Sequence, residues 1–372
     1  MRNLFITLLA AITLFACSQP HTYTVTGTVA QAEFEGGKVL LRHTVEGEQI
    51  TVDSTEVVDG KWSFAGTVEQ PNHYSITITH PENPRSTISI TVILERGDIV
   101  VTTNEERRST VSGTKHNDLL QAFNDKLLAP SQRVNEIWAS MREAQEAGNQ
   151  EQVTLLREEL NAVNEEMRNF RIEFAKTNIN NPAGWTQLRG LMSLPLEDLK
   201  ELIAGATRTT LQTEDVARVA TRIEALERTA VGQPFVDLRM KDVNGNEIAL
   251  SDFAGRGKYV MIDFTATWCG PCRVGKPAMI ATYNKFRDKG VGFQIVGVWF
   301  DSSHEAWSTG MKALNMPDWP QMSDLRGWQS EGAQLYAITG IPHSVLICPE
   351  GIIIARSLRG DALDEKLAEL LK

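Results

Sequence analysis

The sequence predicts a chain of several domains: an N-terminal antiparallel β sandwich or barrel, a helical middle segment and a C-terminal α/β domain. Three patterns lead to this fold class. Apolar and polar residues alternate through 22–115, which is typical of strands that bury one face. Through 116–230, apolar residues recur every three or four positions, as they do in amphipathic helices. From 231 to 372, apolar strand-like runs alternate with helical stretches.

The predicted β-rich domain covers 22–115. Its alternation is clearest in 23–29, 61–64 and 74–79, and turns such as 81–84 separate the strands. Strands at this spacing indicate a small antiparallel sandwich or barrel. The carboxylates fall at turns, where such groups often bond their own backbone. We therefore expect a ligand or partner surface, or a spacer, and no catalytic site.

The predicted helical segment, 116–230, begins with two long helices that form an αα-hairpin around Gly148-Asn149. Two shorter helices follow, capped near Ser193 and Thr213. The second long helix carries one apolar seam, made of Val153, Leu156, Leu160, Val163, Met167, Phe170 and Phe174. A seam of only about three heptads favours packing within the chain, and a homodimer contact is the alternative.

The predicted C-terminal domain, 231–372, opens with a hairpin that turns at Asn244-Gly245. Strands and helices then alternate and end in a second hairpin before the last helix. The predicted strands are 260–264, 292–300, 344–348 and 352–355, and the predicted helices outside the cysteine region are 302–314 and 363–371. This order predicts one sheet with helices on both faces.

Two cysteines, Cys269 and Cys272, stand at the head of the helix that follows the strand 260–264. Free backbone NH groups and the helix dipole favour a thiolate there, so Cys269 is the expected nucleophile. Cys272 lies one turn further on and deeper, where it can attack a mixed disulfide formed at Cys269. Gly270 lets a substrate backbone approach, and Pro271 stiffens the first helical turn. The pattern predicts dithiol–disulfide exchange.

A zinc site and a structural disulfide are the two other interpretations of this cysteine pair. Structural zinc needs four ligands, and the sequence has no second Cys-x-x-Cys and no nearby histidine pair, so we expect no metal. A bridge that closes so short a ring would constrain little of the unfolded chain. The redox interpretation is therefore favoured.

The run Trp268-Cys269-Gly270-Pro271-Cys272 resembles the thioredoxin active site, and Pro277 on the same helix extends the match. Residues 231–372 resemble the TlpA/ResA-type branch of thioredoxin-like proteins, which are membrane-anchored. Residues 22–115 resemble the uncharacterised β-domain that often precedes thioredoxin modules in such lipoproteins. The resemblance implies a thioredoxin-like α/β fold and a thiol-disulfide oxidoreductase that needs no cofactor.

The same resemblance implies roles for further residues. Asp263 would be the family's buried acid, which relays a proton through water to or from Cys272; a plain strand-end carboxylate is the alternative. Ile341-Pro342 would be the cis-proline loop, which packs against the disulfide and presents the Ile341 backbone to an extended substrate. An ordinary trans turn is the alternative there. Trp268 would contact the substrate beside the nucleophile.

The chain departs from two related patterns. Thioredoxin itself carries a core lysine in its central strand, whereas this chain has Val296-Gly297-Val298-Trp299 in that region. A peroxiredoxin site would need proline at 262 and threonine or serine at 266, but the residues are Ile262 and Ala266. The peroxiredoxin interpretation therefore fails, and the second cysteine favours exchange with protein thiols.

The N-terminus reads as an export signal over 1–16, with one basic residue followed by an apolar run. Leu14-Phe15-Ala16-Cys17 resembles a bacterial lipobox, which implies that Cys17 is lipidated and that 17–21 is a short tether. An ordinary cleaved signal with a chance cysteine is the alternative. The apolar run is too short to span a membrane, so we expect the mature chain to be soluble apart from its lipid.

Composition narrows the function further. The chain has 37 basic and 47 acidic residues and a net charge of −10, which argues against a nucleic-acid surface. We expect a lipid-anchored protein of the cell envelope that faces the periplasm and reduces protein disulfides. An exchange pair there needs a second partner, either a membrane electron donor or a thiol oxidant. The alternative is a binding or assembly lipoprotein that uses the β-domain and the helical seam, with the thioredoxin module as a scaffold.

Overall fold

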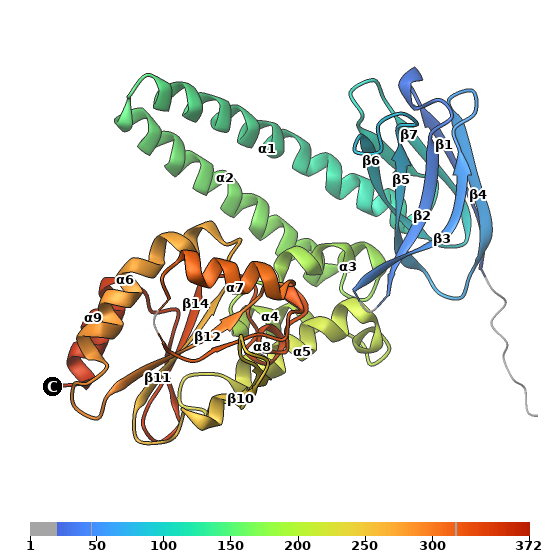
Figure 1. Cartoon of the computed structure of the whole chain (residues 1–372). Coiled ribbons are helices and arrows are strands. Elements are labelled where there is room, and N and C mark those ends of the chain that lie inside the picture. The colour runs from blue at the N-terminus through green and yellow to red at the C-terminus, as the bar shows by residue number, and fades with distance from the viewer. Residues whose placement is uncertain (1–20, 46, 317) are drawn as a thin grey trace, which may run out of the picture. The chain divides into compact units, whose positions relative to one another are not determined.

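The computed structural model describes residues 21–45, 47–316 and 318–372 (Figure 1). The predicted signal peptide, the predicted lipidation site Cys17 and most of the predicted tether lie outside the described residues. The chain divides into two compact units. One contains the described residues up to Arg189 together with Gly205–Thr210, and the other contains Gly190–Ala204 and Leu211–Lys372.

The first unit contains a β sandwich of two four-stranded sheets, in the orders β4-β1-β7-β8 and β3-β2-β5-β6. Apolar side chains from both sheets form one core, which includes Val25, Phe64 and Ile99 from one sheet and Leu41 and Ile76 from the other. The strands are β1 His21–Val29, β2 Lys38–Val45, β3 Glu48–Glu56, β4 Lys61–Val68, β5 Asn72–Thr79, β6 Thr87–Leu94, β7 Gly97–Thr103 and β8 Ser109–Ser112. The predicted strand-rich domain is confirmed, in its sandwich form.

One pair of strands differs from the antiparallel arrangement that we predicted. β1 and β7 run parallel, with Tyr23 opposite Gly97 and Val29 opposite Thr103. The chain passes through the whole of the other sheet between these two strands, and such a long crossover is what a parallel pair requires. Alternation along each strand does not report strand direction, so this detail could not be predicted from the pattern.

The predicted αα-hairpin is formed by α1, Lys115–Glu146, and α2, Gln150–Thr177 (Figure 1). Val153, Leu156 and Leu160 of the seam pack against α1 residues such as Ile137 and Met141. Further along, the seam's phenylalanines stack on Phe123 of α1, with ring centroids 5.1 Å and 4.1 Å apart. The seam therefore packs against α1 within the chain, and a homodimer stays a prediction. Helix α3, Pro182–Leu188, completes the helices of this unit.

The second unit begins with two helices from the predicted helical segment, α4, Leu196–Ile203, and α5, Glu214–Arg228. Arg222 of α5 donates to the carbonyl of Ala337, and Arg356 donates to the carbonyl and hydroxyl of Thr229 at the end of α5. These bonds tie α5 to the C-terminal fold. The predicted boundaries at 115/116 and 230/231 stay a prediction, and the division between the compact units falls inside the predicted helical segment.

The second unit is built on a five-stranded sheet in the order β13-β12-β11-β14-β15. β11, β12 and β13 are parallel, and β14 and β15 are antiparallel to their neighbours. The strands of this unit are β9 Arg239–Lys241, β10 Glu247–Ala249, β11 Tyr259–Thr265, β12 Phe293–Trp299, β13 Gln321–Met322, β14 His343–Ile347 and β15 Ile353–Arg356. Its other helices are α6 Gly270–Phe286, α7 His304–Ala313, α8 Glu331–Leu335 and α9 Asp361–Leu370.

Short 3-10 turns occur in both units, at Ala32–Phe34, Arg189–Leu191, Thr210–Gln212, Leu250–Asp252 and Gly327–Gln329.

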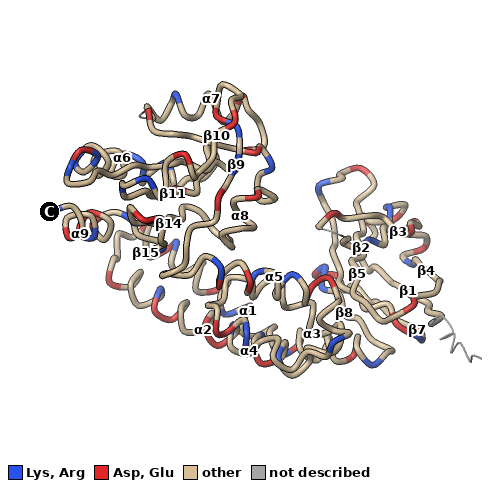
Figure 2. Tube along the Cα trace, turned by 90° about the horizontal axis from the view of Figure 1, so that it is seen from below, with Lys and Arg blue, Asp and Glu red and all other residues tan. Residues whose placement is uncertain are grey.

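The two faces of this sheet have separate cores because residues alternate along β11. Met261 points to the core shared with α6 and α9, which includes Phe286 and Leu367. Val260, Ile262 and Phe264 point to the core shared with the β9–β10 hairpin and α8. The predicted α/β arrangement of the C-terminal region is confirmed. Acidic and basic residues are interspersed along the described elements of both units (Figure 2).

Candidate active site

The cysteine pair lies at the junction of β11 and α6. Cys269 is the N-cap residue of α6, and its backbone NH bonds to the carbonyl of Ala266 at 3.2 Å. A disulfide joins it to Cys272, with the two Cα atoms 5.3 Å apart. The NH of Cys272 donates to the sulfur of Cys269 at 3.2 Å. The first sulfur therefore sits where helix NH groups and the helix dipole stabilise negative charge.

The two cysteines are almost buried, but residues next to them in the chain are exposed. The exposed fraction is 5% for Cys269 and 3% for Cys272, so the disulfide shows little sulfur surface. Its neighbours are open: Trp268 is 53% exposed, and Gly270 and Pro271 are exposed. A side chain at residue 270 would meet no atom within 4 Å, so another backbone can approach closely there.

The loop Thr265–Trp268 that presents Cys269 is held by Asp301, whose exposed fraction is 1%. The backbone NH of Thr267 donates to one Asp301 oxygen at 3.1 Å, and the Thr267 hydroxyl donates to the other. Gly310 of α7 touches the same threonine, because a Cβ at 310 would lie 2.3 Å from the Thr267 methyl carbon. The loop is thereby fixed from the segment that follows β12 and from α7.

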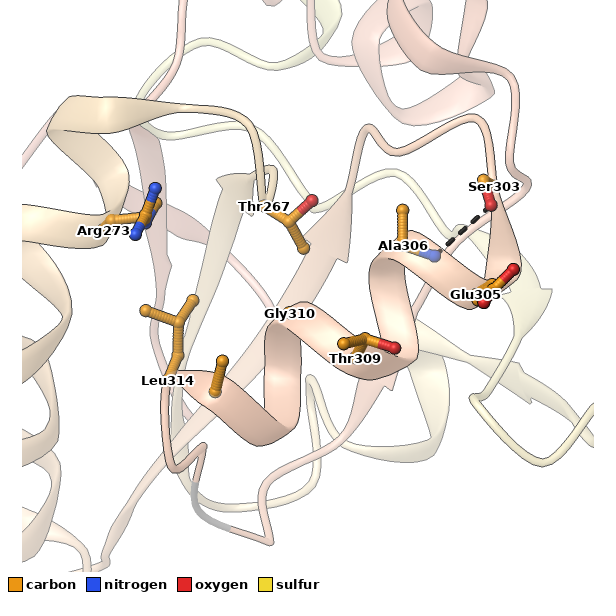
Figure 3. Close-up of a pocket in the computed structure, with 9 residues that line it drawn as sticks. Thr267, Arg273, Ser303, Glu305, Ala306, Thr309, Gly310 and Leu314 are labelled. Atoms are coloured by element: carbon orange, nitrogen blue, oxygen red, sulfur yellow. Dashed lines mark hydrogen bonds between the residues drawn. The ribbon is translucent and has the colours of Figure 1, made fainter.

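A surface pocket of about 520 Å³ lies beside this loop (Figure 3). Figure 3 shows Arg273 of α6 on one side and α7 on the other, with Thr267 between them. Ser303, Glu305 and Thr309 make the α7 side polar. The pocket adjoins the cysteine loop but does not contain the sulfurs.

The Ile341-Pro342 bond is cis, as the resemblance implied. The carbonyl oxygen of Ile341 lies 3.7 Å from the sulfur of Cys269. Segments more than seventy residues apart in the chain thus meet at the disulfide. The fold brings together the predicted site residues Cys269, Cys272, Ile341 and Pro342.

Asp263 is buried behind the pair, and it has a partner that the sequence analysis missed. Lys276 of α6 forms an ion pair with the Asp263 carboxylate, and both side chains are 2% exposed. The Lys276 ammonium also lies 5.3 Å from the ring centre of Trp299. Gly297 stands opposite Asp263 on β12, so the strand offers no side chain and the amine comes from the helix instead. Lys276 is four residues after Cys272, and this one-turn spacing was the available signal.

Trp328 is the second residue that the sequence analysis missed. It lies in the 3-10 turn Gly327–Gln329, and its ring centre is 6.1 Å from that of Trp268. It is 47% exposed. The NH of the Trp268 ring donates a hydrogen bond to the carbonyl of Phe300 at 3.2 Å, which fixes the ring. The two rings make an exposed aromatic surface beside Cys269, which we call the tryptophan pair. An isolated tryptophan in a loop gave no sequence signal for this.

His343 follows the cis-proline and is kept uncharged at neutral pH. Burial first, and then the positive charges of Arg356, Arg359 and Arg222, lower the pKa of His343 to about 4. Its ring therefore acts as a packing group near Phe264 rather than as an acid or base, with ring centres 6.3 Å apart.

Within the described ranges, no group of three or more histidine, cysteine or acidic side chains could hold a metal ion. The helices of those ranges also include none that is long and apolar enough to cross a membrane.

Two family models match separate parts of the chain. The family described as "AhpC/TSA family" matches residues 231–356, and a domain of unknown function, DUF4369, matches residues 23–120. The thiol-disulfide oxidoreductase ResA of Bacillus thuringiensis is 31% identical over 146 residues, which are 39% of this chain and 79% of ResA. Nucleoredoxin of Xenopus laevis is 34% identical over 107 residues, 29% of this chain and 25% of that protein.

Solved structures are similar over the same part. The thioredoxin domain of a thiol-disulfide oxidoreductase from Bacteroides vulgatus is 35% identical, with a TM-score of 0.35, and the match covers 38% of this chain and 99% of that one. A thiol-disulfide oxidoreductase from Bacteroides fragilis is 31% identical, with a TM-score of 0.35, over 37% of this chain and 100% of that one. From the similarity to ResA, the chain belongs to the ResA-like family of thiol-disulfide oxidoreductases, with the uncharacterised DUF4369 domain at its N-terminal side.

Proposed function

We propose that this thiol-disulfide oxidoreductase reduces protein disulfides in the cell envelope, with Cys269 as nucleophile, Cys272 as resolving thiol and Asp263 as proton acceptor. The observation that carries the proposal is the Cys269–Cys272 disulfide at the N-terminus of α6, 3.7 Å from the Ile341 carbonyl. A redox-active pair needs its attacking sulfur at a site that favours thiolate. The place of Cys269 at the N-terminus of α6 supports that role.

The reaction begins when the Cys269 thiolate attacks one sulfur of the client disulfide. The client bond breaks, its leaving thiolate takes up a proton, and a mixed disulfide forms. Cys272 then loses its proton towards Asp263 and attacks the sulfur of Cys269. The mixed disulfide breaks, and the second client thiolate leaves and is protonated. Two electrons have passed from the dithiol to the client, and Cys269 and Cys272 end as a disulfide.

The client is held in an extended conformation along the Ile341 backbone, in the manner of an added strand. Gly270 and Pro271 leave room for its main chain, and Trp268 packs against a side chain next to its cysteine. Trp328 enlarges this aromatic contact. The exposed fractions of the tryptophan pair, 53% and 47%, support this role.

The direction of the reaction is reduction. In thioredoxin the Cys-Gly-Pro-Cys turn accompanies a strongly reducing potential of about −270 mV. A partner must then return two electrons to the disulfide after each turnover, and a membrane electron donor is the partner that fits an envelope protein. Titration against glutathione buffers measures the potential. A value close to that of a strong oxidant, about −120 mV, would reverse the direction and make the partner a thiol oxidant.

Anchoring through a lipid on Cys17, facing the periplasm, rests on the lipobox-like sequence before that residue. Cys17→Ala should move the protein from the membrane fraction to the soluble fraction. A protein that is soluble with Cys17 intact would exclude the anchor.

Reduction of insulin disulfides tests the activity. The wild-type protein should catalyse it in the presence of a dithiol donor, and Cys269→Ser should abolish it. Equal activity in both proteins would leave the cysteine pair without a role and would favour a binding or assembly function.

A further inference from the structure

The ion pair between Asp263 and Lys276 lies under the resolving cysteine in the protein interior. A lone buried carboxylate is costly because it loses its hydration, and a buried ammonium is costly for the same reason. Each charge compensates the other, so loss of one leaves the other buried and unpaired. A carboxylate left in that state takes up a proton instead.

A cavity of about 150 Å³ joins this ion pair to Cys272. Asp263, Cys272 and Lys276 are all on its wall. Water needs about 10–15 Å³ of accessible space and polar partners, so the cavity can hold more than one water molecule. Thr265 supplies such a partner, because its buried hydroxyl has no hydrogen bond to any group in the described part of the chain.

The cavity also has wall residues at the protein surface. Gly275 and Arg359 line it and are exposed. A Cβ at residue 275 would meet no atom within 4 Å, so the glycine leaves its side of the wall open. The charged and titratable groups that face the cavity are Asp263 of β11, Cys272 and Lys276 of α6, and Arg359 in the segment before α9.

We propose that Lys276 is the positioning residue that holds Asp263 ionised, and that the cavity beside Gly275 carries the proton between Cys272 and solvent. The proposal rests on the proposed function and adds to it the residue that makes Asp263 a base. Before resolution, Asp263 accepts the proton of Cys272 through water, and the thiolate attacks Cys269. The proton then leaves through the cavity. Lys276 contacts neither substrate nor the reacting sulfurs.

Reaction of the reduced protein with Ellman's reagent separates the two cysteines. Attack by Cys269 releases one thionitrobenzoate and leaves the other on its sulfur. Attack by Cys272 on that mixed disulfide releases the second. The first release reports the proposed nucleophile, and the second reports deprotonation of the resolving thiol. Loss of the first release would therefore contradict the role of Cys269 as nucleophile. An altered second release alone concerns the role of Lys276.

Lys276→Met keeps the length of the side chain and removes its charge. The second release should slow about a hundredfold at pH 7, the scale of a lost general base, and should recover as the pH is raised. The first release should be unchanged. Lys285→Met is the matched control, because Lys285 lies on the same helix but is about half exposed. It should leave both releases unchanged.

The double variant decides whether Lys276 acts through Asp263. Asp263→Asn should slow the second release as Lys276→Met does, and adding Lys276→Met to Asp263→Asn should slow it no further. An unchanged pH profile in Lys276→Met, or a full additional loss in the Asp263→Asn background, would overturn the proposal. Circular dichroism and an intact first release show that each variant is folded.

Discussion

Cys269 and Asp263 illustrate how little of a reactive site is set by residue type alone. Cys269 lies at the N-terminus of α6, where its sulfur accepts a hydrogen bond from the NH of Cys272. The aspartate is tolerated in the interior because an ammonium from the next helix pairs with it. His343, which follows the cis bond Ile341-Pro342, is held neutral by burial and by arginines.

The neutral state of His343 makes stability depend on pH. The pKa of His343 is about 4 in the folded chain, against about 6.5 in an unfolded one. Between these values the unfolded chain binds a proton that the folded chain does not, so the free energy of unfolding falls as the pH is lowered from 6.5 to 4. The loss is at most about 3 kcal/mol. Urea unfolding across this range should show the decrease in the free energy of unfolding for the wild type. The control His304→Gln should show the same decrease, and His343→Gln should show a smaller one.

Trp328 should contribute to client binding rather than to the chemistry. Trp328→Ala is expected to raise KM for a protein disulfide about tenfold, or about 1.4 kcal/mol, because exposed aromatic residues beside a site carry much of an interface's binding energy. The rate with Ellman's reagent should be unchanged. Trp138→Ala is the control, since Trp138 of α1 is equally exposed at 48%. An unchanged KM in Trp328→Ala would remove the tryptophan pair from the client site.

At the scale of elements, β11, α6 and α7 position the site. β11 ends at Thr265, α6 begins one residue after Cys269, and α7 approaches the connecting loop at Gly310. Helix α7 lies close against the loop at Gly310, whereas Gly275 of α6 has free space around it. Substitution of each glycine measures this difference in packing.

Gly310→Ala should destabilise the protein, whereas Gly275→Ala should stabilise it slightly. A Cβ at 310 would lie 2.3 Å from the Thr267 methyl carbon, and relieving such overpacking typically costs about 1–3 kcal/mol. A Cβ at 275 meets nothing, so the helix gains the usual advantage of alanine over glycine, about 0.5–1 kcal/mol. Thermal unfolding of both variants measures the difference. Equal effects would contradict the close approach of α7 to the loop.

At the scale of the whole molecule, local patterns in the sequence predicted most elements, and tertiary contacts determined the rest. Alternation predicted the sandwich strands, and the spacing of Cys269 and Cys272 predicted a dithiol pair, which a disulfide joins in the structure. The parallel pairing of β1 with β7 arises from a contact between distant segments, which no local pattern records. The same holds for α5, which reads as part of a helical segment and packs with the C-terminal fold.

The contacts of α5 predict where a stable C-terminal fragment begins. A fragment from Leu211 keeps Arg222 with Ala337 and Thr229 with Arg356, and a fragment from Val231 loses both. The shorter fragment should therefore have a lower melting temperature, by several degrees for each kcal/mol lost. Equal melting temperatures would show that α5 adds nothing to the fold.

In the proposed reaction, Cys269 attacks a client disulfide and Cys272 releases the client. The most direct measurement uses Cys272→Ser, which keeps the nucleophile and lacks the resolving thiol. Mixed with an oxidised client protein, this variant should accumulate a covalent complex that a reductant dissolves, and mass spectrometry should place the bond on Cys269. A complex that forms equally well in Cys269→Ser/Cys272→Ser, or no complex in Cys272→Ser, would contradict the account.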